Sequence, residues 1–168
     1  MLFEAYIGLG SNLGNRVSNV MRGLDYIEAL AERITVSSLY ETLPVDFQRQ
    51  PRFMNAVCRI STRLNPFKLM AQCKTIESQL GRSRAFPNAP RAIDLDILIH
   101  GHTVIHSPWL QIPHKSMASR AFVLMPLAEI APNLLHPVFN ASVKQLLEKI
   151  PDKNIGVRRL YTYTMTQQ

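Results

Sequence analysis

The residues best suited to chemistry are two aspartates, Asp94 and Asp96, in the segment IDLDI at 93–97. Because successive side chains of a strand point to opposite faces, the two carboxylates share one face while their apolar neighbours enter the core. Carboxylates held this close repel each other unless a cation lies between them. Mg²⁺ commonly takes one or two carboxylates and completes its shell with water and substrate phosphates. The pattern predicts a magnesium site, and a solvated strand face is the alternative.

Basic residues on both sides of this pair indicate that the ligand carries phosphate. Arg82, Arg84 and Arg91 precede the aspartates, and Lys115 and Arg120 follow them. A guanidinium group can donate two parallel, charge-assisted hydrogen bonds to a phosphate. Any one of these arginines, taken alone, is more often simply solvated. Their clustering around one acidic strand favours a polyphosphate site that holds magnesium.

Two other motifs are compatible with either a functional or a structural role. His114, in the sequence IPHK at 112–115, could contact a phosphate or cap a loop. The glycine-rich GLGSNLG at 8–14 has neither the GxGxxG spacing of a dinucleotide site nor the GK[ST] of a phosphate loop. It predicts instead a strand-to-helix turn in which Ser11 or Asn12 caps the following helix.

The composition is that of a globular protein. With 168 residues, of which 46% are hydrophobic, the chain is expected to form one domain over 1–168, and the packing of its tail, 152–168, is left open. An excess of 19 Lys and Arg over 12 Asp and Glu favours anionic partners, whether nucleotides, nucleic acid or a membrane surface. Cys58 and Cys73 lack metal-binding spacing and are interpreted as reduced thiols. Neither a secretory signal nor a long apolar span is visible, so we expect a cytoplasmic protein.

Hydrophobic periodicity and the positions of Gly and Pro predict alternating strands and helices. Strands are predicted at 3–9, 34–40, 54–64 and 92–99, and helices at 15–31, 66–80, 121–130 and 141–150. A short strand pair is expected before 112–114, a final strand or arm over 154–166, and proline-containing loops at 42–52 and 82–91.

The helix at 66–80 has the clearest end signals, with Asn65 as N-cap, Pro66 as first helical residue and Gly81 as stop. The order β-α-β-β-α-β with a C-terminal extension predicts the fold class α+β. The expected architecture is a ferredoxin-like sandwich, in which an antiparallel sheet has helices on one face and the other face free to carry a site.

Four sequence blocks resemble the 6-hydroxymethyl-7,8-dihydropterin pyrophosphokinase family of folate biosynthesis. They are YIGLGSNLGNR at 6–16, SSLYETLPV and QPRFMNAV within 37–57, GRSR and PRAIDLDIL within 81–98, and IPHKSMASRAFVLMPLAEIAP at 112–132. The resemblance implies the same sandwich fold and a Mg-dependent enzyme. The implied reaction transfers pyrophosphate from ATP to the hydroxymethyl group of the pterin and releases AMP.

The resemblance also implies roles for individual residues. Asp94 and Asp96 are implied to bind two Mg²⁺ ions and, with Arg82 and Arg91, to form the catalytic group; Asp96 is the nearest candidate for a general base. Contacts to ATP are implied for Glu77, Arg82, Arg84, Arg91, His114 and Arg120. The pterin pocket is implied to contain Thr42, Leu43, Pro44, Val45, Phe53, Asn55 and Phe122. In it the phenylalanines stack on the pterin faces and Asn55 reads the pterin edge.

The loop before the acidic strand departs from the family pattern. Residues 85–89 read AFPNA and lack the lysine common there, Leu43 replaces a frequent proline, and Lys115 stands where proline or an aromatic residue is usual. Loops 43–52 and 82–91 are expected to close over the substrates. The departures therefore leave open a relative that binds pterin or nucleotide with little transfer, or that uses another pterin alcohol.

An RNA-binding sheet is an alternative from another class, because RNA recognition modules share this element order and the chain is basic. No RNP signature is present, and Asp94 and Asp96 would repel phosphates without a metal. The expected partners are therefore small molecules, ATP and the hydroxymethyl dihydropterin, with no nucleic acid and no membrane. We also expect a monomer.

Overall fold

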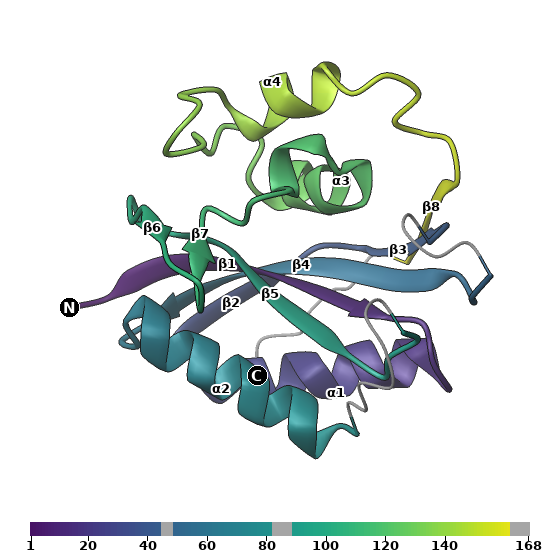
Figure 1. The fold of residues 1–168 in the computed structure, drawn as a ribbon, viewed down its shortest axis with the longest axis horizontal. Coiled ribbons are helices and arrows are strands. Elements are labelled where there is room, and N and C mark those ends of the chain that lie inside the picture. Colours follow the sequence, from purple (N-terminus) through teal and green to yellow (C-terminus); the bar gives the residue numbers. More distant parts are fainter. Residues whose placement is uncertain (45–48, 82–88, 162–168) are drawn as a thin grey trace.

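A six-stranded antiparallel sheet lies between two layers of helices (Figure 1). The computed structural model describes residues 1–44, 49–81 and 89–161. Within these residues the strand order is β5-β1-β4-β3-β8. Strand β3 pairs with residues 53–55 of β4, and β2 pairs with residues 58–61 of the same strand. The predicted mixture of helices with an antiparallel sheet is confirmed.

The elements have the following bounds. The strands are β1 Phe3–Ser11, β2 Arg33–Val36, β3 Leu39–Thr42, β4 Phe53–Thr62, β5 Asp94–His100, β6 Ile105–His106, β7 Gln111–Ile112 and β8 Val157–Tyr161. The helices are α1 Arg16–Glu28, α2 Pro66–Gln79, α3 Ala121–Ile130 and α4 Val143–Glu148, with a 3₁₀ turn at Met117–Ser119. No helix in the described part of the chain has the length and apolar character needed to cross a bilayer.

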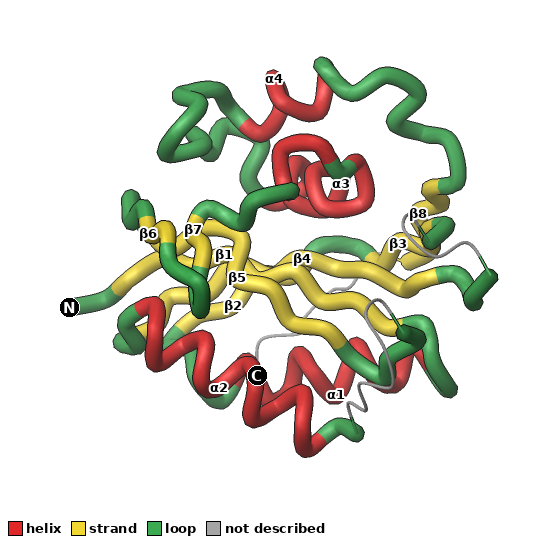
Figure 2. Tube along the Cα trace, in the orientation of Figure 1, coloured by secondary structure: helices red, strands yellow, loops and turns green. Residues whose placement is uncertain are grey.

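Helices α1 and α2 cover one face of the sheet (Figure 2). The side chain of Asn65 accepts a hydrogen bond from the Lys68 amide at the start of α2, and Gly81 ends this helix with a φ of +87°. These predicted signals are confirmed. The predicted cap of α1 is wrong. Asn15 caps that helix by accepting from the Ser18 amide, because β1 continues through Ser11 and delays the turn.

The opposite face of the sheet is not free, which corrects the prediction. Helix α3 lies on this face, and α4 packs against the outer side of α3 (Figures 1 and 2). The sheet presents apolar side chains on this face as well, including Tyr6, Val57 and Leu98, and they form a second core with Leu124 and Val143. An apolar sheet surface of this kind must be covered, so the chain after β5 returns to pack against it.

The strand predicted at 34–40 is two strands, β2 and β3, separated by two buried serines. The Ser37 hydroxyl accepts from the Val57 amide and donates to the Ser38 carbonyl, so it replaces regular ladder bonds at this point. The predicted strand pair β6–β7 and the helix at 121–130 are confirmed, with Pro126 inside the helix. Part of the tail forms β8, which pairs with β3.

Candidate active site

The floor of the site consists of two glycines on β1. Gly8 lies opposite Asp96 and Gly10 opposite Asp94 in the β1–β5 pairing, while Gly10 faces Asn55 of β4 on its other side. A Cβ atom on Gly10 would lie 3.0 Å from the Asn55 Oδ1 atom. The absence of side chains at these two glycines therefore leaves open space between the two aspartates and the Asn55 amide. This role was not predicted, although the alternation Gly-Leu-Gly within a strand was its visible signal.

A pocket of about 230 Å³ opens above this floor, beside α3. It brings together most of the predicted site residues that the structure describes, namely Thr42, Leu43, Phe53, Asn55, Arg91, Asp94, Asp96, His114, Arg120 and Phe122. Gln50 and Leu98 also line it and were not anticipated. Residues as far apart in the chain as Gly8 and Val123 thus converge on one cavity.

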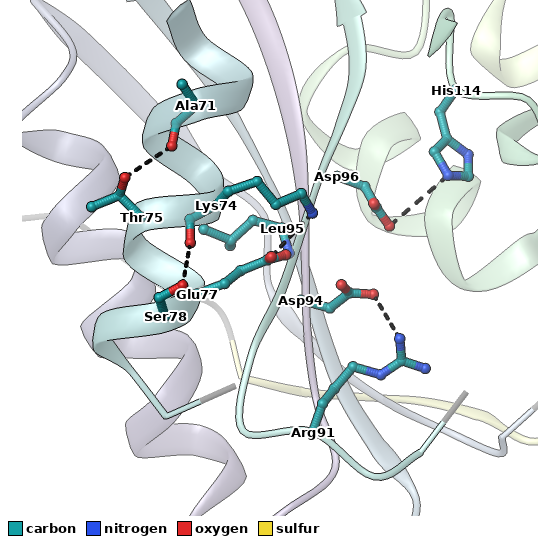
Figure 3. Close-up of polar contacts among 10 residues, drawn as sticks. All are labelled: Ala71, Lys74, Thr75, Glu77, Ser78, Arg91, Asp94, Leu95, Asp96 and His114. Atoms are coloured by element: carbon teal, nitrogen blue, oxygen red, sulfur yellow. Dashed lines mark hydrogen bonds and ion pairs between the residues drawn. The ribbon is translucent and has the colours of Figure 1, made fainter. Parts of the chain in front are cut away.

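Asp94 and Asp96 point into this pocket from β5, while Leu95 between them is fully buried on the other face (Figure 3). The Asp94 carboxylate pairs with the Arg91 guanidinium at 3.2 Å. Burial, followed by the charge of Asp94, raises the pKa of Asp96 to about 6. The prediction that both carboxylates share one face is confirmed. Because the two ionised carboxylates repel each other, they form a suitable donor set for a divalent cation.

No cluster of three or more His, Cys, Asp or Glu ligands occurs in the residues that the structure describes. A cation held by Asp94 and Asp96 would therefore take its remaining ligands from water and substrate oxygens. Mg²⁺ commonly binds in this way, whereas structural zinc requires four protein ligands. The donor set therefore fits magnesium carried with a polyphosphate.

His114 faces the acids from the opposite side, with its Nε2 atom 4.0 Å from Asp96 Oδ2 (Figure 3). Burial, with the charges of Arg120 and Lys115 adding to it, lowers the pKa of His114 to about 4. Its Nδ1 atom accepts from the Ser116 amide at 3.3 Å. The neutral ring therefore carries its proton on Nε2 and presents a donor to the pocket.

Arg91 combines three features that suit a phosphate ligand. Its guanidinium lies over the Phe53 ring at 5.6 Å and pairs with Asp94. Its Nε atom is buried without a hydrogen-bond partner among the described residues. Arg120 lies in the same way over the Phe122 ring at 5.6 Å. Both cations are thus placed at the border between the acids and the aromatic part of the pocket.

Asn55 and Thr42 form the polar edge at the other end of the pocket. The Asn55 amide donates to the Thr42 hydroxyl at 2.6 Å, and both residues are buried. This bond fixes the amide plane and leaves the Asn55 carbonyl oxygen directed over Gly10. Together with Phe53 and Phe122, the pair makes a slot suited to a flat ring with polar edges.

Glu77 lies apart from the pocket. It projects from α2 to the back of β5, where its carboxylate accepts from the Leu95 amide at 2.8 Å and pairs with Lys74 at 3.0 Å (Figure 3). Pro44 is buried and does not line the cavity. Val45, Arg82 and Arg84, and the altered segment 85–88, lie outside the described residues.

Asn12 is a site-supporting residue that sequence analysis assigned to a helix cap. Its side chain donates to Gln50 Oε1 at 2.8 Å and accepts from the Arg91 amide at 2.9 Å. Its backbone amide also donates to the Arg91 carbonyl at 3.1 Å. One buried asparagine therefore joins the chain segments that carry Gln50 and Arg91 into the pocket.

Comparison with known proteins assigns the chain to a family. The model of the 7,8-dihydro-6-hydroxymethylpterin-pyrophosphokinase (HPPK) family matches residues 6–132, which is more than half of the chain. The chain belongs to this family. The predicted resemblance is thereby confirmed, and the matched span contains every residue of the pocket.

Relatives of the HPPK family occur alone and within longer proteins. A Pseudomonas aeruginosa 2-amino-4-hydroxy-6-hydroxymethyldihydropteridine pyrophosphokinase is 41% identical over 95% of this chain and 98% of its own length. The Folic acid synthesis protein fol1 of Pneumocystis carinii is 44% identical over 89% of this chain, which spans only 20% of that relative. A crystal structure of wild-type Plasmodium falciparum HPPK-DHPS has a TM-score of 0.77 at 18% identity, covering 95% of this chain and 47% of that one, and supports the fold.

Proposed function

We propose that this protein transfers pyrophosphate from ATP to the hydroxymethyl group of 6-hydroxymethyl-7,8-dihydropterin, forming the pterin diphosphate and AMP in folate biosynthesis. One observation carries the proposal: a single pocket joins paired carboxylates and cations at one end to a flat slot with a polar edge at the other. The first end suits a metal-bound polyphosphate and the second suits a pterin. Full-length relatives named for this reaction support the assignment.

The acidic end of the pocket would hold the phosphates. Asp94 and Asp96 would bind Mg²⁺, two ions as the resemblance implies, which when bound neutralise and align phosphate oxygens. Arg91 and Arg120 would donate to the same oxygens, and the buried Arg91 Nε atom would gain the partner it lacks. His114, neutral with its proton on Nε2, would donate to an oxygen that becomes more negative during transfer.

The polar slot would orient the acceptor alcohol. Phe53 and Phe122 would pack on the pterin faces, and Asn55, held by Thr42, would pair with the pterin edge. The hydroxymethyl group would then lie toward Asp96, close to the β-phosphorus. Catalysis would depend mainly on this positioning and on electrostatic stabilisation. Asp96 is the nearest candidate for the proton acceptor, because its carboxylate lines the pocket beside the expected position of the acceptor alcohol.

Further parts of the proposal concern Glu77, Val45, Arg82 and Arg84. We keep the arginines as ATP contacts and Val45 as a pterin contact on the resemblance alone. Glu77 would act indirectly, by fixing the Leu95 amide and hence the strand that carries both acids. The ferredoxin-like class, supported by the strand order, a monomeric state and a cytoplasmic location complete the proposal.

The test is the formation of AMP from ATP, Mg²⁺ and the hydroxymethyl dihydropterin. We expect turnover with the wild type and a fall of about 10³-fold or more in Asp96→Ala, with Asp25→Ala on the exposed side of α1 as the control. Tight pterin binding by calorimetry without AMP formation would favour instead a relative that has lost transfer. Unchanged AMP formation in Asp96→Ala would refute the assigned metal site.

A further inference from the structure

We propose that the C-terminal strand β8 shapes the pterin end of the pocket, and that Gly156 is a positioning residue acting through Leu43. The inference rests on the proposed function. The family model matches residues 6–132, so β8 lies beyond the matched segment.

Strand β8 extends the sheet along the strand that delivers two pocket residues. Thr42 pairs with Val157, and the Leu43 amide donates to the Gly156 carbonyl at 3.0 Å. Thr42 also pairs with Phe53 of β4 on its other side. The end of β3 is thus held between two strands at the point where the chain enters the pocket wall.

Gly156 allows the Leu43 side chain to lie against the backbone of the tail. Gly156 has a φ of +70°, and a Cβ atom there would lie 2.5 Å from Leu43 Cδ1 and 2.9 Å from its Cγ. Leu43 is 45% exposed, so it would move rather than disrupt the core. A methyl group at Gly156 would therefore displace one wall of the pterin slot.

A partly buried polar network fixes β8 in this place. The Arg159 Nε atom donates to the Ser38 hydroxyl at 2.9 Å, and its Nη2 atom pairs with Glu129 of α3 at 3.3 Å. Glu129 also accepts from the Ser38 amide and from the Tyr40 hydroxyl. The tail, the start of β3 and α3 are therefore joined through one carboxylate.

A second network ties β8 to the segment before β4. Arg158 pairs with Glu41 at 3.4 Å, and Glu41 pairs with Arg16 at 3.0 Å. Arg16 also donates to the Arg52 carbonyl at 2.7 Å, directly before the pocket residue Phe53. Displacing β8 would thus shift both Leu43 and Phe53.

The test compares Gly156→Ala with Gly101→Ala. Gly101 has a φ of +53°, and no described residue has an atom within 4 Å of its Cβ position, so it matches the backbone strain without the contact. We expect Gly156→Ala to raise the KM for pterin about fivefold, as when one wall side chain leaves its rotamer, with kcat and the KM for ATP within about twofold. Gly101→Ala should change none of the three.

Two further variants keep the test decisive if Gly156→Ala folds poorly. Arg159→Ala should raise the pterin KM in the same direction by releasing β8, whereas Arg63→Ala, which removes an exposed ion pair with Glu32, should not. In a Leu43→Ala background, Gly156→Ala should lose most of its effect because the obstructing atoms are gone.

The outcomes separate the inference from the proposed function. An active wild type in which Gly156→Ala and Arg159→Ala match their controls would overturn the role of β8 alone. A wild type that neither binds pterin nor forms AMP would overturn the function and this inference together.

Discussion

The two faces of the sheet are made by alternate residues of the same strands, yet they differ in kind. On the face under α1 and α2, residues such as Leu9 and Leu95 are buried in an uninterrupted apolar core. On the opposite face the same strands present Gly10 and Asp96, and α3 leaves this part open as the pocket. The face that α1 and α2 cover therefore contributes mainly to stability. The face that α3 covers only in part can carry a binding site.

The largest expected effect comes from the covered face. Leu95→Ala removes a fully buried side chain from the α2 side and should lower the free energy of unfolding by about 3 kcal/mol. Urea denaturation measures this change. The folded fraction of the variant should retain its KM for pterin, because the slot lies across the sheet. A large rise in that KM would show that the faces are not independent.

Asn55→Leu makes the corresponding change on the pocket face. The leucine would leave polar atoms of the pterin and the Thr42 hydroxyl without their partner, so pterin affinity should fall about 10- to 100-fold. Calorimetry with the pterin measures it, and Asn133→Leu at an exposed position is the control. Unaltered affinity would remove Asn55 from the pterin slot.

Matched glycine substitutions compare the faces directly. Gly10→Ala places a methyl 3.0 Å from Asn55 Oδ1 and should raise the pterin KM about tenfold with little change in stability. Gly23→Ala in α1 places a methyl 3.3 Å from Leu9 Cδ2, on the covered face. It should alter the free energy of unfolding by at most about 1 kcal/mol and leave the KM unchanged. Equal KM effects in both variants would contradict the distinction.

The smallest expected effect is a pH-dependent gain in stability. The folded state raises the pKa of Asp96 to about 6 from an ordinary value of 3.8, so ionising this group opposes folding as pH rises through that window. In EDTA, Asp96→Asn should therefore be more stable than the wild type at pH 7, by about 1 kcal/mol after screening of a carboxylate that is 41% exposed.

The advantage of Asp96→Asn should shrink as pH falls from 6 to 4, where the wild-type carboxyl is protonated. Urea denaturation at several pH values measures it, and Asp25→Asn is the control. Adding Mg²⁺ with a non-hydrolysable ATP analogue should stabilise the wild type more than the variant. If the two proteins differed in free energy of unfolding by the same amount across this pH range, the folded state would not raise the pKa of Asp96.

Local patterns explain which features could be predicted. The spacing of Asp94 and Asp96 in a strand was enough to place both carboxylates on one face, since side-chain alternation depends only on neighbouring residues. The ends of α2 could be predicted equally well, because the N-cap contact joins residues only three positions apart. The prediction of a free second face was wrong, because apolar positions in the strands do not say that a later segment, here α3, will bury them.

The sequence by itself determined the acids, the family blocks and the chemistry they imply, because these depend on residue type and short spacing. Only the tertiary structure decided that Gly8 and Gly10 form the floor, that Asn12 joins two distant segments, and that β8 borders Leu43. Each of these is a contact between strands or loops far apart in the chain. Strand neighbours are selected by the whole sheet, so no local pattern specifies them.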